Sequence, residues 1–241
     1  MPNSTPPPHP CGNCRFYTNS IWQPVAANAM SKLSRGFTRQ DLNAGQPLYH
    51  QDDENQGVFC VSKGLIALRT HHSDGSSTLL RLAYPGEIIG FRSFLESRPH
   101  RTEAQALLPS RVCTVAQRDA QQVVQTNPSV LTRLTSRCIT ENDRNHDRII
   151  AAATTPNKQR LVDILQRLMT AHGTQIDNHM HMQLPLSRTD LADLLGVQTE
   201  TVSRLLKRIQ HDGTFQVSGR AILMPLAPPA RRTATAEAAQ R

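Results

Sequence analysis

One stretch of the sequence, Pro185–Leu206, constrains the fold more than any other, and it runs PLSRTDLADLLGVQTETVSRLL. Ser187 can cap a first helix, with Asp190 three residues later as its capping-box partner. Gly196 suits the end of that helix, because glycine adopts positive φ without steric cost. Thr199 can cap a second helix. A short helix, a glycine turn and a second helix predict a helix-turn-helix unit, whose second helix enters the DNA major groove.

The predicted second helix has an apolar face and a polar, basic face. The candidate DNA contacts are Thr199, Glu200, Thr201, Ser203, Arg204, Lys207 and Arg208. Further along, Phe215–Val217 and Ala221–Met224 flank a Ser-Gly-Arg turn whose Arg220 is a predicted phosphate contact, and this pattern predicts a β-hairpin, or wing. The alternative is a pair of amphipathic helices in an ordinary helical domain, and the hairpin favours a winged helix-turn-helix instead.

The charge balance favours a polyanionic partner. The chain has 241 residues and a formal net charge of +8, with a sequence pI near 9.8. No apolar stretch approaches the ~20 residues of a membrane span, and the proline-rich N-terminus lacks the regions of a signal peptide. We therefore expect a cytoplasmic protein with no membrane partner. Its five cysteines are then reduced thiols or metal ligands rather than disulfides.

Composition and turn signals divide the chain into five parts and predict an α+β fold. Residues 1–24 are predicted to be a disordered, cysteine-bearing segment. Short apolar runs between turn signals over 25–127 predict an antiparallel β-barrel or sandwich. Helical periodicity over 128–154 predicts one long helix, and 155–225 holds the winged helix-turn-helix. The Ala-, Pro- and Arg-rich residues 226–241 are predicted to be a disordered tail.

The long helix begins favourably, because Asn127 can cap it and Pro128 at the first helical position loses no hydrogen bond. A broken apolar stripe follows, which a second copy of the chain would cover in a two-stranded coiled coil. The predicted dimer contacts on this stripe are Leu131, Leu134, Cys138, Asn145, Ile149 and Ala152. Glu141 and Asp147 are expected near the seam, where like charges would keep the dimer marginal. The alternative is that the stripe packs on the chain's own β domain.

Near the N-terminus, Cys11-Gly12-Asn13-Cys14 places two thiols within reach of one metal atom. A thiol-redox pair and a coincidence are the alternatives. A zinc finger is excluded because no second C-x2-C pair follows at a suitable spacing. A redox enzyme also lacks support, since no thioredoxin-like βαβ pattern surrounds the pair. We predict that the protein is not an enzyme.

Residues from about 10 to 225 together resemble the CRP/FNR superfamily of bacterial transcription regulators, and within it the FNR-like branch. The motifs that carry the resemblance are Gly45–Leu48, Val61–Gly64, Pro85–Gly90 and Leu194–Leu206. The resemblance implies an N-terminal antiparallel β-roll of the cyclic-nucleotide-binding type, a long dimerisation helix and a C-terminal winged helix-turn-helix. It also implies a homodimer that binds a palindromic promoter site in double-stranded DNA and acts with RNA polymerase.

FNR-like recognition helices carry a Glu followed three residues later by Ser-Arg, and Glu200, Ser203 and Arg204 match that pattern. Glu200 can accept a hydrogen bond from cytosine N4, and Arg204 can bond guanine O6 and N7. The resemblance implies TTGAT-like half-sites in an inverted repeat. Thr199 occupies the place of an additional Arg in CRP-type proteins, which argues against a CRP-type site.

The FNR-like branch is known for oxygen-labile iron–sulfur clusters, and Cys11, Cys14 and Cys113 match three of its four cysteine ligands. The resemblance therefore implies a 4Fe–4S cluster that responds to oxygen, redox state or nitric oxide. Ser20 occupies the place of the fourth cysteine, and a hydroxyl is a poorer ligand for soft cluster iron than a thiolate. The candidates for the fourth ligand are Ser20, His9, Asp41 and another thiol.

The remaining cysteines have other predicted roles, Cys60 as a buried core thiol and Cys138 as a small apolar filler on the dimer stripe. A chain that has lost the cluster would be a CRP/FNR-type regulator acting constitutively or through another effector, haem or a small molecule. Arg101-Thr102 aligns with a pair that holds a cyclic-nucleotide phosphate in CRP-like β-rolls. Phe91, however, replaces the glutamate expected at the ribose, so cyclic AMP is disfavoured and Arg101 is predicted to be a surface charge.

Overall fold

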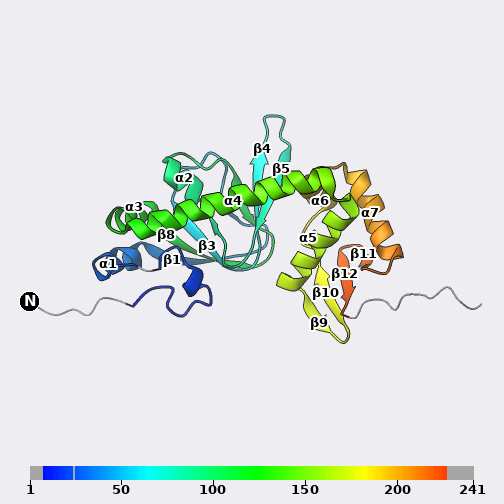
Figure 1. Ribbon diagram of the computed structural model, residues 1–241, viewed down its shortest axis with the longest axis horizontal. Helices are drawn as coiled ribbons and strands as arrows, with labels where there is room; N and C mark the ends of the chain where they lie inside the picture. The colour runs from blue at the N-terminus through cyan, green and yellow to red at the C-terminus, as the bar shows by residue number, and fades with distance from the viewer. Residues whose placement is uncertain (1–7, 24, 227–241) are drawn as a thin grey trace, which may run out of the picture. The chain divides into compact units, whose positions relative to one another are not determined.

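The computed structural model describes residues 8–23 and 25–226, and the chain divides into two compact units, Met1–Thr155 and Pro156–Arg241 (Figure 1). The first unit holds β1–β8 and α1–α4, and the second holds α5–α7 and β9–β12. Antiparallel sheets, one long helix and a C-terminal helix-turn-helix confirm the predicted α+β fold. Within the described ranges, no helix is both long and apolar enough to span a membrane. The predicted tail after residue 226 lies outside those ranges.

The first unit is built on two four-stranded antiparallel sheets, in the orders β1-β8-β3-β6 and β2-β7-β4-β5. Their strands are β1 (Phe37–Leu42), β2 (Pro47–Tyr49), β3 (Gly57–Lys63), β4 (Ile66–His71), β5 (Ser77–Ala83), β6 (Ile88–Ile89), β7 (Glu103–Ala106) and β8 (Ser110–Ala116). Phe59 and Val61 of β3 belong to the core that the two sheets share. Successive side chains of a strand point to opposite faces, so Val58 and Cys60 belong to a second core.

Three short helices contribute to this second core, α1 (Ala27–Gly36), α2 (Phe91–Glu96) and α3 (Gln117–Thr126). The N-terminal segment closes it, because Ile21 and Trp22 are only 2% and 3% exposed. The prediction of disorder over residues 1–24 is therefore wrong for 8–23, where Ile21 and Trp22 are buried and Phe16 and Tyr17 are partly buried. Residues 1–7 and 24 lie outside the described ranges.

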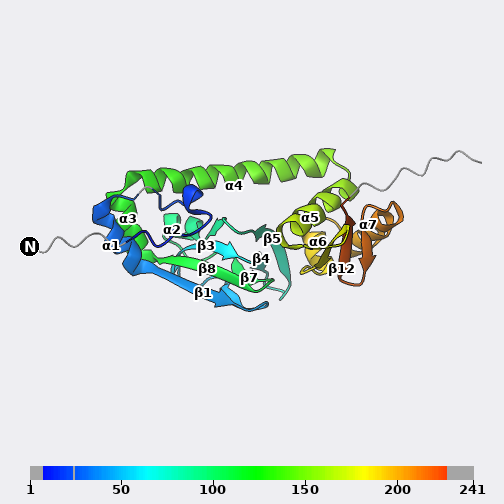
Figure 2. The same ribbon diagram turned by 90° about the horizontal axis from the view of Figure 1, so that it is seen from below.

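The long helix is α4 (Pro128–Thr154), with Pro128 in its first turn as predicted. Asn127 precedes it but makes no capping bond from its side chain. Its amide instead ties three elements together, since Oδ1 accepts from the Ala26 amide at 2.9 Å and Nδ2 donates to the Val123 carbonyl at 3.1 Å. Figure 2 shows α4 running along one side of the β strands.

The predicted dimer stripe is only partly at the surface. Leu134 is fully buried in the second core and Cys138 packs against that core, so Leu134 does not face a partner helix. Glu141 is also not at a seam, because it forms an ion pair with Arg81 of β5 at 2.8 Å. Asn145, Ile149 and Ala152 are exposed, and their role as dimer contacts stays a prediction. The large apolar side chains of α4 that are exposed are Leu131, Ile139, Ile149 and Ile150.

The second unit comprises α5 (Asn157–His172), α6 (Arg188–Leu195), α7 (Thr199–His211) and a four-stranded antiparallel sheet. Its strands are β9 (Thr174–Ile176), β10 (His179–Gln183), β11 (Gln216–Ser218) and β12 (Ala221–Pro225), in the order β11-β12-β10-β9. The predicted wing is β11–β12, and β10 pairs with β12 to anchor it. Phe215, just before β11, is fully buried at the base of the wing.

The turn of the helix-turn-helix has the predicted chemistry. Ser187 Oγ accepts from the Asp190 amide at 3.0 Å, and the Asp190 carboxylate accepts from the Ser187 amide at 2.7 Å, which completes a capping box. Gly196 ends α6 in the left-handed conformation, at φ 68°. The prediction that Thr199 caps the second helix is wrong by one residue. Gln198 occupies the cap with extended backbone angles, and Thr199 is the first helical residue.

Candidate cysteine site and DNA-binding surface

The cysteine pair near the N-terminus lies in a series of tight turns. The Gly12 amide donates to the His9 carbonyl and the Cys14 amide to the Cys11 carbonyl, both at 2.8 Å. The Tyr17 amide continues the series by donating to the Cys14 carbonyl at 2.9 Å. These turns bring both thiols to one side of the segment, where they line the same cavity.

That cavity, about 420 Å³ in volume, lies between the N-terminal segment and the sheet that contains β1, β3 and β8. Cys11, Cys14 and Cys113, the predicted ligands, all line it. Cys60, which was predicted to be a buried core thiol, lines it as well. Ser20, at the position expected for the fourth ligand, is a further lining residue.

Strand pairing explains why two cysteines from the β-roll meet there. In the antiparallel register, Cys60 of β3 lies directly opposite Cys113 of β8, and Cys113 lies opposite Arg39 of β1. Directly opposed residues point to the same face with Cβ atoms about 4.5–5.5 Å apart. The prediction of Cys60 as a core thiol is thus incomplete. It packs against the second core but remains partly exposed, at the cavity.

The three candidate ligands that carry no thiol differ in their surroundings. Both ring nitrogens of His9 are engaged, Nδ1 by the Cys11 amide and Nε2 by the Trp22 carbonyl, each at 3.0 Å. The Asp41 side chain is 68% exposed and forms an ion pair with Arg111 at 2.7 Å. Ser20 Oγ accepts from the Trp22 amide at 3.2 Å, so its hydroxyl helps to form a turn.

The thiols of the cavity influence one another electrostatically. Burial, together with the neighbouring Cys113 and Cys14, raises the pKa of Cys11 to about 11, while Arg39 opposes the rise. Burial likewise raises the pKa of Cys60 to about 12, with added contributions from the other three thiols. Nucleophilic redox cysteines need a lowered pKa. This environment therefore does not support the alternative of a thiol-redox pair.

Among the residues that the structure describes, no group of three or more His, Cys, Asp or Glu side chains converges as a single metal ion requires. The thiols instead surround a space. An iron–sulfur cluster is bound by cysteine thiolates on different iron atoms, so its ligands enclose a volume rather than meet at one point. Thiolates are also the ligands that such clusters prefer. The donor set and the cavity fit a cluster better than a single ion.

The N-terminal segment is bound to both the β-roll and α4. Phe16 packs on Gly86, which has φ 90° and whose Cα is so near the ring that an added Cβ would lie 2.8 Å from Phe16 Cδ1. From α4, Arg133 donates to the Ser20 carbonyl at 3.0 Å and Arg137 donates to the Asn19 carbonyl at 2.9 Å. Figure 2 shows this dark-blue segment between α4 and the strands. The cysteine site is therefore connected directly to the long helix.

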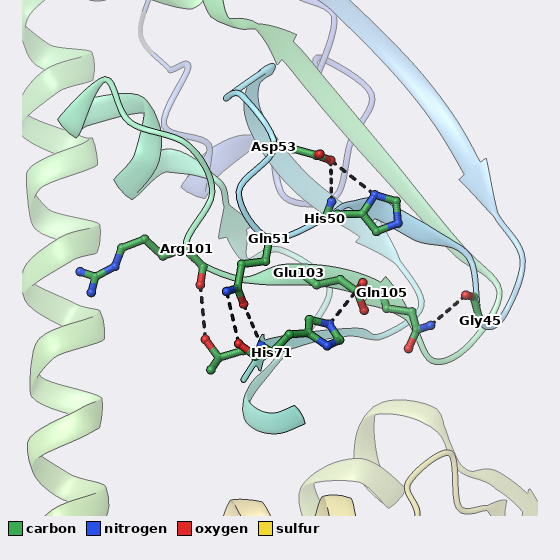
Figure 3. A network of polar contacts seen from close by, with 9 residues as sticks. Gly45, His50, Gln51, Asp53, His71, Arg101, Glu103 and Gln105 are labelled. Carbon is green, nitrogen blue, oxygen red and sulfur yellow. Dashed lines mark hydrogen bonds and ion pairs between the residues drawn. The ribbon is translucent and has the colours of Figure 1, made fainter. Parts of the chain in front are cut away.

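A second cavity, of about 660 Å³, occupies the place at which the resemblance puts a cyclic nucleotide. Thr102 there forms a hydrogen bond with the buried hydroxyl of Tyr49, and the Arg81–Glu141 ion pair connects the strand to α4. Figure 3 shows that the Arg101 carbonyl joins a polar network at the edge of the β-roll, while its guanidinium points away from that network. Arg101 is exposed, in agreement with its predicted role as a surface charge.

The DNA-binding candidates lie mostly on the exposed side of α7. Val202, Leu205, Leu206 and Ile209 are buried. Glu200, Ser203, Arg204, Lys207 and Arg208 are exposed, and Thr199 and Thr201 are partly exposed. The Ser203 hydroxyl donates to the Thr199 carbonyl at 3.2 Å, so its lone pairs face outward as acceptors. In the wing, Arg220 is the predicted phosphate contact. Its Nε also donates to the Leu184 carbonyl at 3.1 Å, a bond within the protein.

Two family models match the chain, and they cover both units. The cyclic nucleotide-binding domain matches residues 39–127, and the Crp-like helix-turn-helix domain matches residues 159–226. The transcriptional regulatory protein btr of Bordetella pertussis is 28% identical over 216 residues, which are 88% of each chain. The fumarate and nitrate reduction regulatory protein of Escherichia coli is 24% identical over 88% of this chain and 85% of its own. The solved structure of FixK2 from Bradyrhizobium japonicum has a TM-score of 0.63 at 25% identity, over 78% of this chain and 92% of that one.

A β-roll of the cyclic nucleotide-binding type, a long helix and a Crp-like helix-turn-helix define a class of DNA-binding regulators. The chain belongs to the CRP/FNR superfamily of transcription regulators. The relatives named above are regulatory proteins.

Proposed function

We propose that the protein binds an inverted repeat of TTGAT-like half-sites, with one α7 in the major groove of each half-site. The observation that carries this proposal is the exposed row of Glu200, Ser203 and Arg204 on a helix whose opposite face is buried. Glu200 accepts from cytosine N4, and Arg204 donates to guanine O6 and N7. The phosphate contacts that set the position of the helix are Lys207, Arg208 and Arg220, and Thr199 and Thr201 are further DNA contacts on the same helix.

The second half-site requires a second copy of the chain. Leu131, Ile139, Ile149 and Ile150 are between 43% and 68% exposed in one protomer, which is unusual for side chains so apolar. A second α4 would bury them in a parallel helix pair. Such a homodimer places its two recognition helices about 34 Å apart, one turn of DNA. At a promoter, RNA polymerase is the expected further partner.

We further infer that Cys11, Cys14 and Cys113 hold an iron–sulfur cluster of the 4Fe–4S type. Their position around one cavity supports this, together with the resemblance to the FNR-like branch. When bound, such a cluster supplies iron that oxygen or nitric oxide can attack. The residues of the segment transmit the change, because Arg133 and Arg137 connect it to α4 through the carbonyls of Ser20 and Asn19. Release of the segment therefore removes bonds that position the dimer helix.

The test is anaerobic purification, followed by measurement of iron, acid-labile sulfide and affinity for a TTGAT palindrome before and after exposure to air. We expect iron and sulfide in comparable amounts, a visible absorption that bleaches in air, and a parallel loss of DNA affinity. Arg204→Ala is the control that loses DNA binding without losing iron. Tight, air-independent binding by a protein without iron would instead favour a cluster-free regulator that acts constitutively or through another effector, such as haem or a small molecule.

A further inference from the structure

The cavity of the cysteine site is lined by four thiols, although the family pattern accounts for only three of them. Cys11, Cys14 and Cys113 match that pattern, and Cys60 is the additional one. The fifth cysteine, Cys138, is not among the residues that line this cavity. Since a 4Fe–4S cluster takes four ligands, the number of thiols around the cavity equals the number of ligands required.

The sheet holds Cys60 in a position suited to this role. It lies opposite Cys113 on the neighbouring strand, and its side chain shares a face with Val58 rather than with Phe59 and Val61. Two adjacent strands of a sheet are rigid supports compared with a loop, so these two thiols keep a fixed separation. The turns around Cys11 and Cys14 supply the other half of the site from the opposite wall.

Ser20 has a different role in the same wall. Its hydroxyl accepts from the Trp22 amide at 3.2 Å and also forms a hydrogen bond with Cys11. As a hard oxygen donor it is a poor match for cluster iron. His9 and Asp41, the remaining candidates, make the bonds described above and do not line the cavity.

We propose that Cys60 supplies the fourth thiolate of the iron–sulfur site, and that Ser20 is a structural hydrogen-bond partner rather than a ligand. This inference rests on the proposed function of the protein as a cluster-binding regulator. Each thiol gives up its proton to solvent as it binds iron, so four thiolates bring four negative charges into the cavity. Arg39 and Arg111 line the same cavity. Arg39 offsets part of that charge, whereas Arg111 is already paired with Asp41.

The experiment compares four anaerobically purified full-length proteins: the unmodified chain, Cys60→Ala, Ser20→Ala and Cys138→Ala. Iron and acid-labile sulfide per chain, the visible absorption spectrum and visible circular dichroism are measured for each. We expect Ser20→Ala and Cys138→Ala to match the unmodified protein. Cys60→Ala should lose the visible absorption of the four-iron cluster and most of its iron and sulfide. Cys138→Ala is the matched control, because it removes a partly buried thiol that packs against the same core.

The outcomes separate this inference from the proposal on which it rests. Loss of the cluster in Ser20→Ala with full retention in Cys60→Ala would overturn the inference and leave the proposed function standing. Absence of iron and sulfide from the unmodified protein, or a disulfide between Cys60 and Cys113 after anaerobic purification, would overturn both. Cys60→Ser provides a second variant should the alanine variant fold poorly, and its far-ultraviolet circular dichroism and thermal melting verify that the domain is intact.

Discussion

Substitution of Gly86 by alanine should release the N-terminal segment from the β-roll. Gly86 has φ 90°, a conformation that costs an L-residue roughly 1–2 kcal/mol. The added Cβ would also lie 2.8 Å from Cδ1 and 3.0 Å from Cε1 of Phe16. Because favourable carbon contacts lie at about 3.5–4.0 Å, the ring must move by roughly 0.7 Å or more. Phe16 follows Cys14 by two residues, so this movement disturbs the cysteine site.

Gly45→Ala is the matched control, because Gly45 has nearly the same φ, 87°, and nothing lies within 4 Å of its added Cβ. Both variants should lower the free energy of unfolding by about 1–2 kcal/mol from the backbone conformation alone. Only Gly86→Ala should also increase the rate at which Cys11 and Cys14 react with a thiol reagent in iron-free protein. The emission of Trp22, the single tryptophan of the chain, gives an independent measure of whether the segment is bound.

The double variant Phe16→Ala, Gly86→Ala isolates the contact further. If Gly86 is needed to make room for the Phe16 ring, then Gly86→Ala should do less harm once the ring is removed. In the Phe16→Ala background it should lower the free energy of unfolding by no more than Gly45→Ala does, since residues in contact are not additive. Equal labelling rates in Gly86→Ala and Gly45→Ala would refute the reasoning, because Phe16 would then not be what holds the segment on the sheet.

Three further predictions concern DNA binding, core packing and pH. Arg204→Ala should reduce the free energy of binding to the cognate palindrome by about 1–3 kcal/mol and relax the preference at one base pair. Lys207→Ala should instead weaken binding to all DNA sequences. In titrations at several salt concentrations it should reduce the slope of log affinity against log salt concentration by about 1. Leu134→Ala should lower the free energy of unfolding by about 3–5 kcal/mol, while Leu131→Ala should mainly weaken self-association in sedimentation. Burial lowers the pKa of His100 to about 4, so the free energy of unfolding should fall by roughly 1–3 kcal/mol between pH 6.5 and 4, and His100→Gln should flatten that dependence in denaturant titrations.

The helix-turn-helix was predictable because its signals are local. The capping box of Ser187 and Asp190, the left-handed Gly196 and the β-hairpin wing each depend on residues a few positions apart. The error at Thr199 is of the same local kind. Threonine is a preferred cap residue, so the sequence favours Thr199 as the cap. The backbone angles, which the sequence does not give, place the cap at Gln198 instead.

The long helix was predictable in its extent but not in its orientation. Its apolar residues lie on more than one face of the helix. Helical periodicity alone does not tell which of these faces contacts the chain's own core and which is exposed. Leu134 is buried against the chain's own core, whereas Leu131, three residues earlier, is 43% exposed. The disorder of residues 1–24 was overestimated for a related reason. The prolines before residue 11 indicate disorder, but the sequence does not show that Ile21 and Trp22 are buried in the β-roll and hold the segment there.

The sequence by itself determined the class of the protein. The features that define this class depend on residues close together in the chain: the order of the elements, the glycine turns and the polar face of α7. It also identified three of the thiols that meet at the cavity. Only the tertiary structure placed Cys60 beside Cys113, because strand register joins residues that are far apart in the chain. No local period encodes which strand lies next to which. The same long-range packing decided that Arg133 and Arg137 of α4 bond to the cysteine segment.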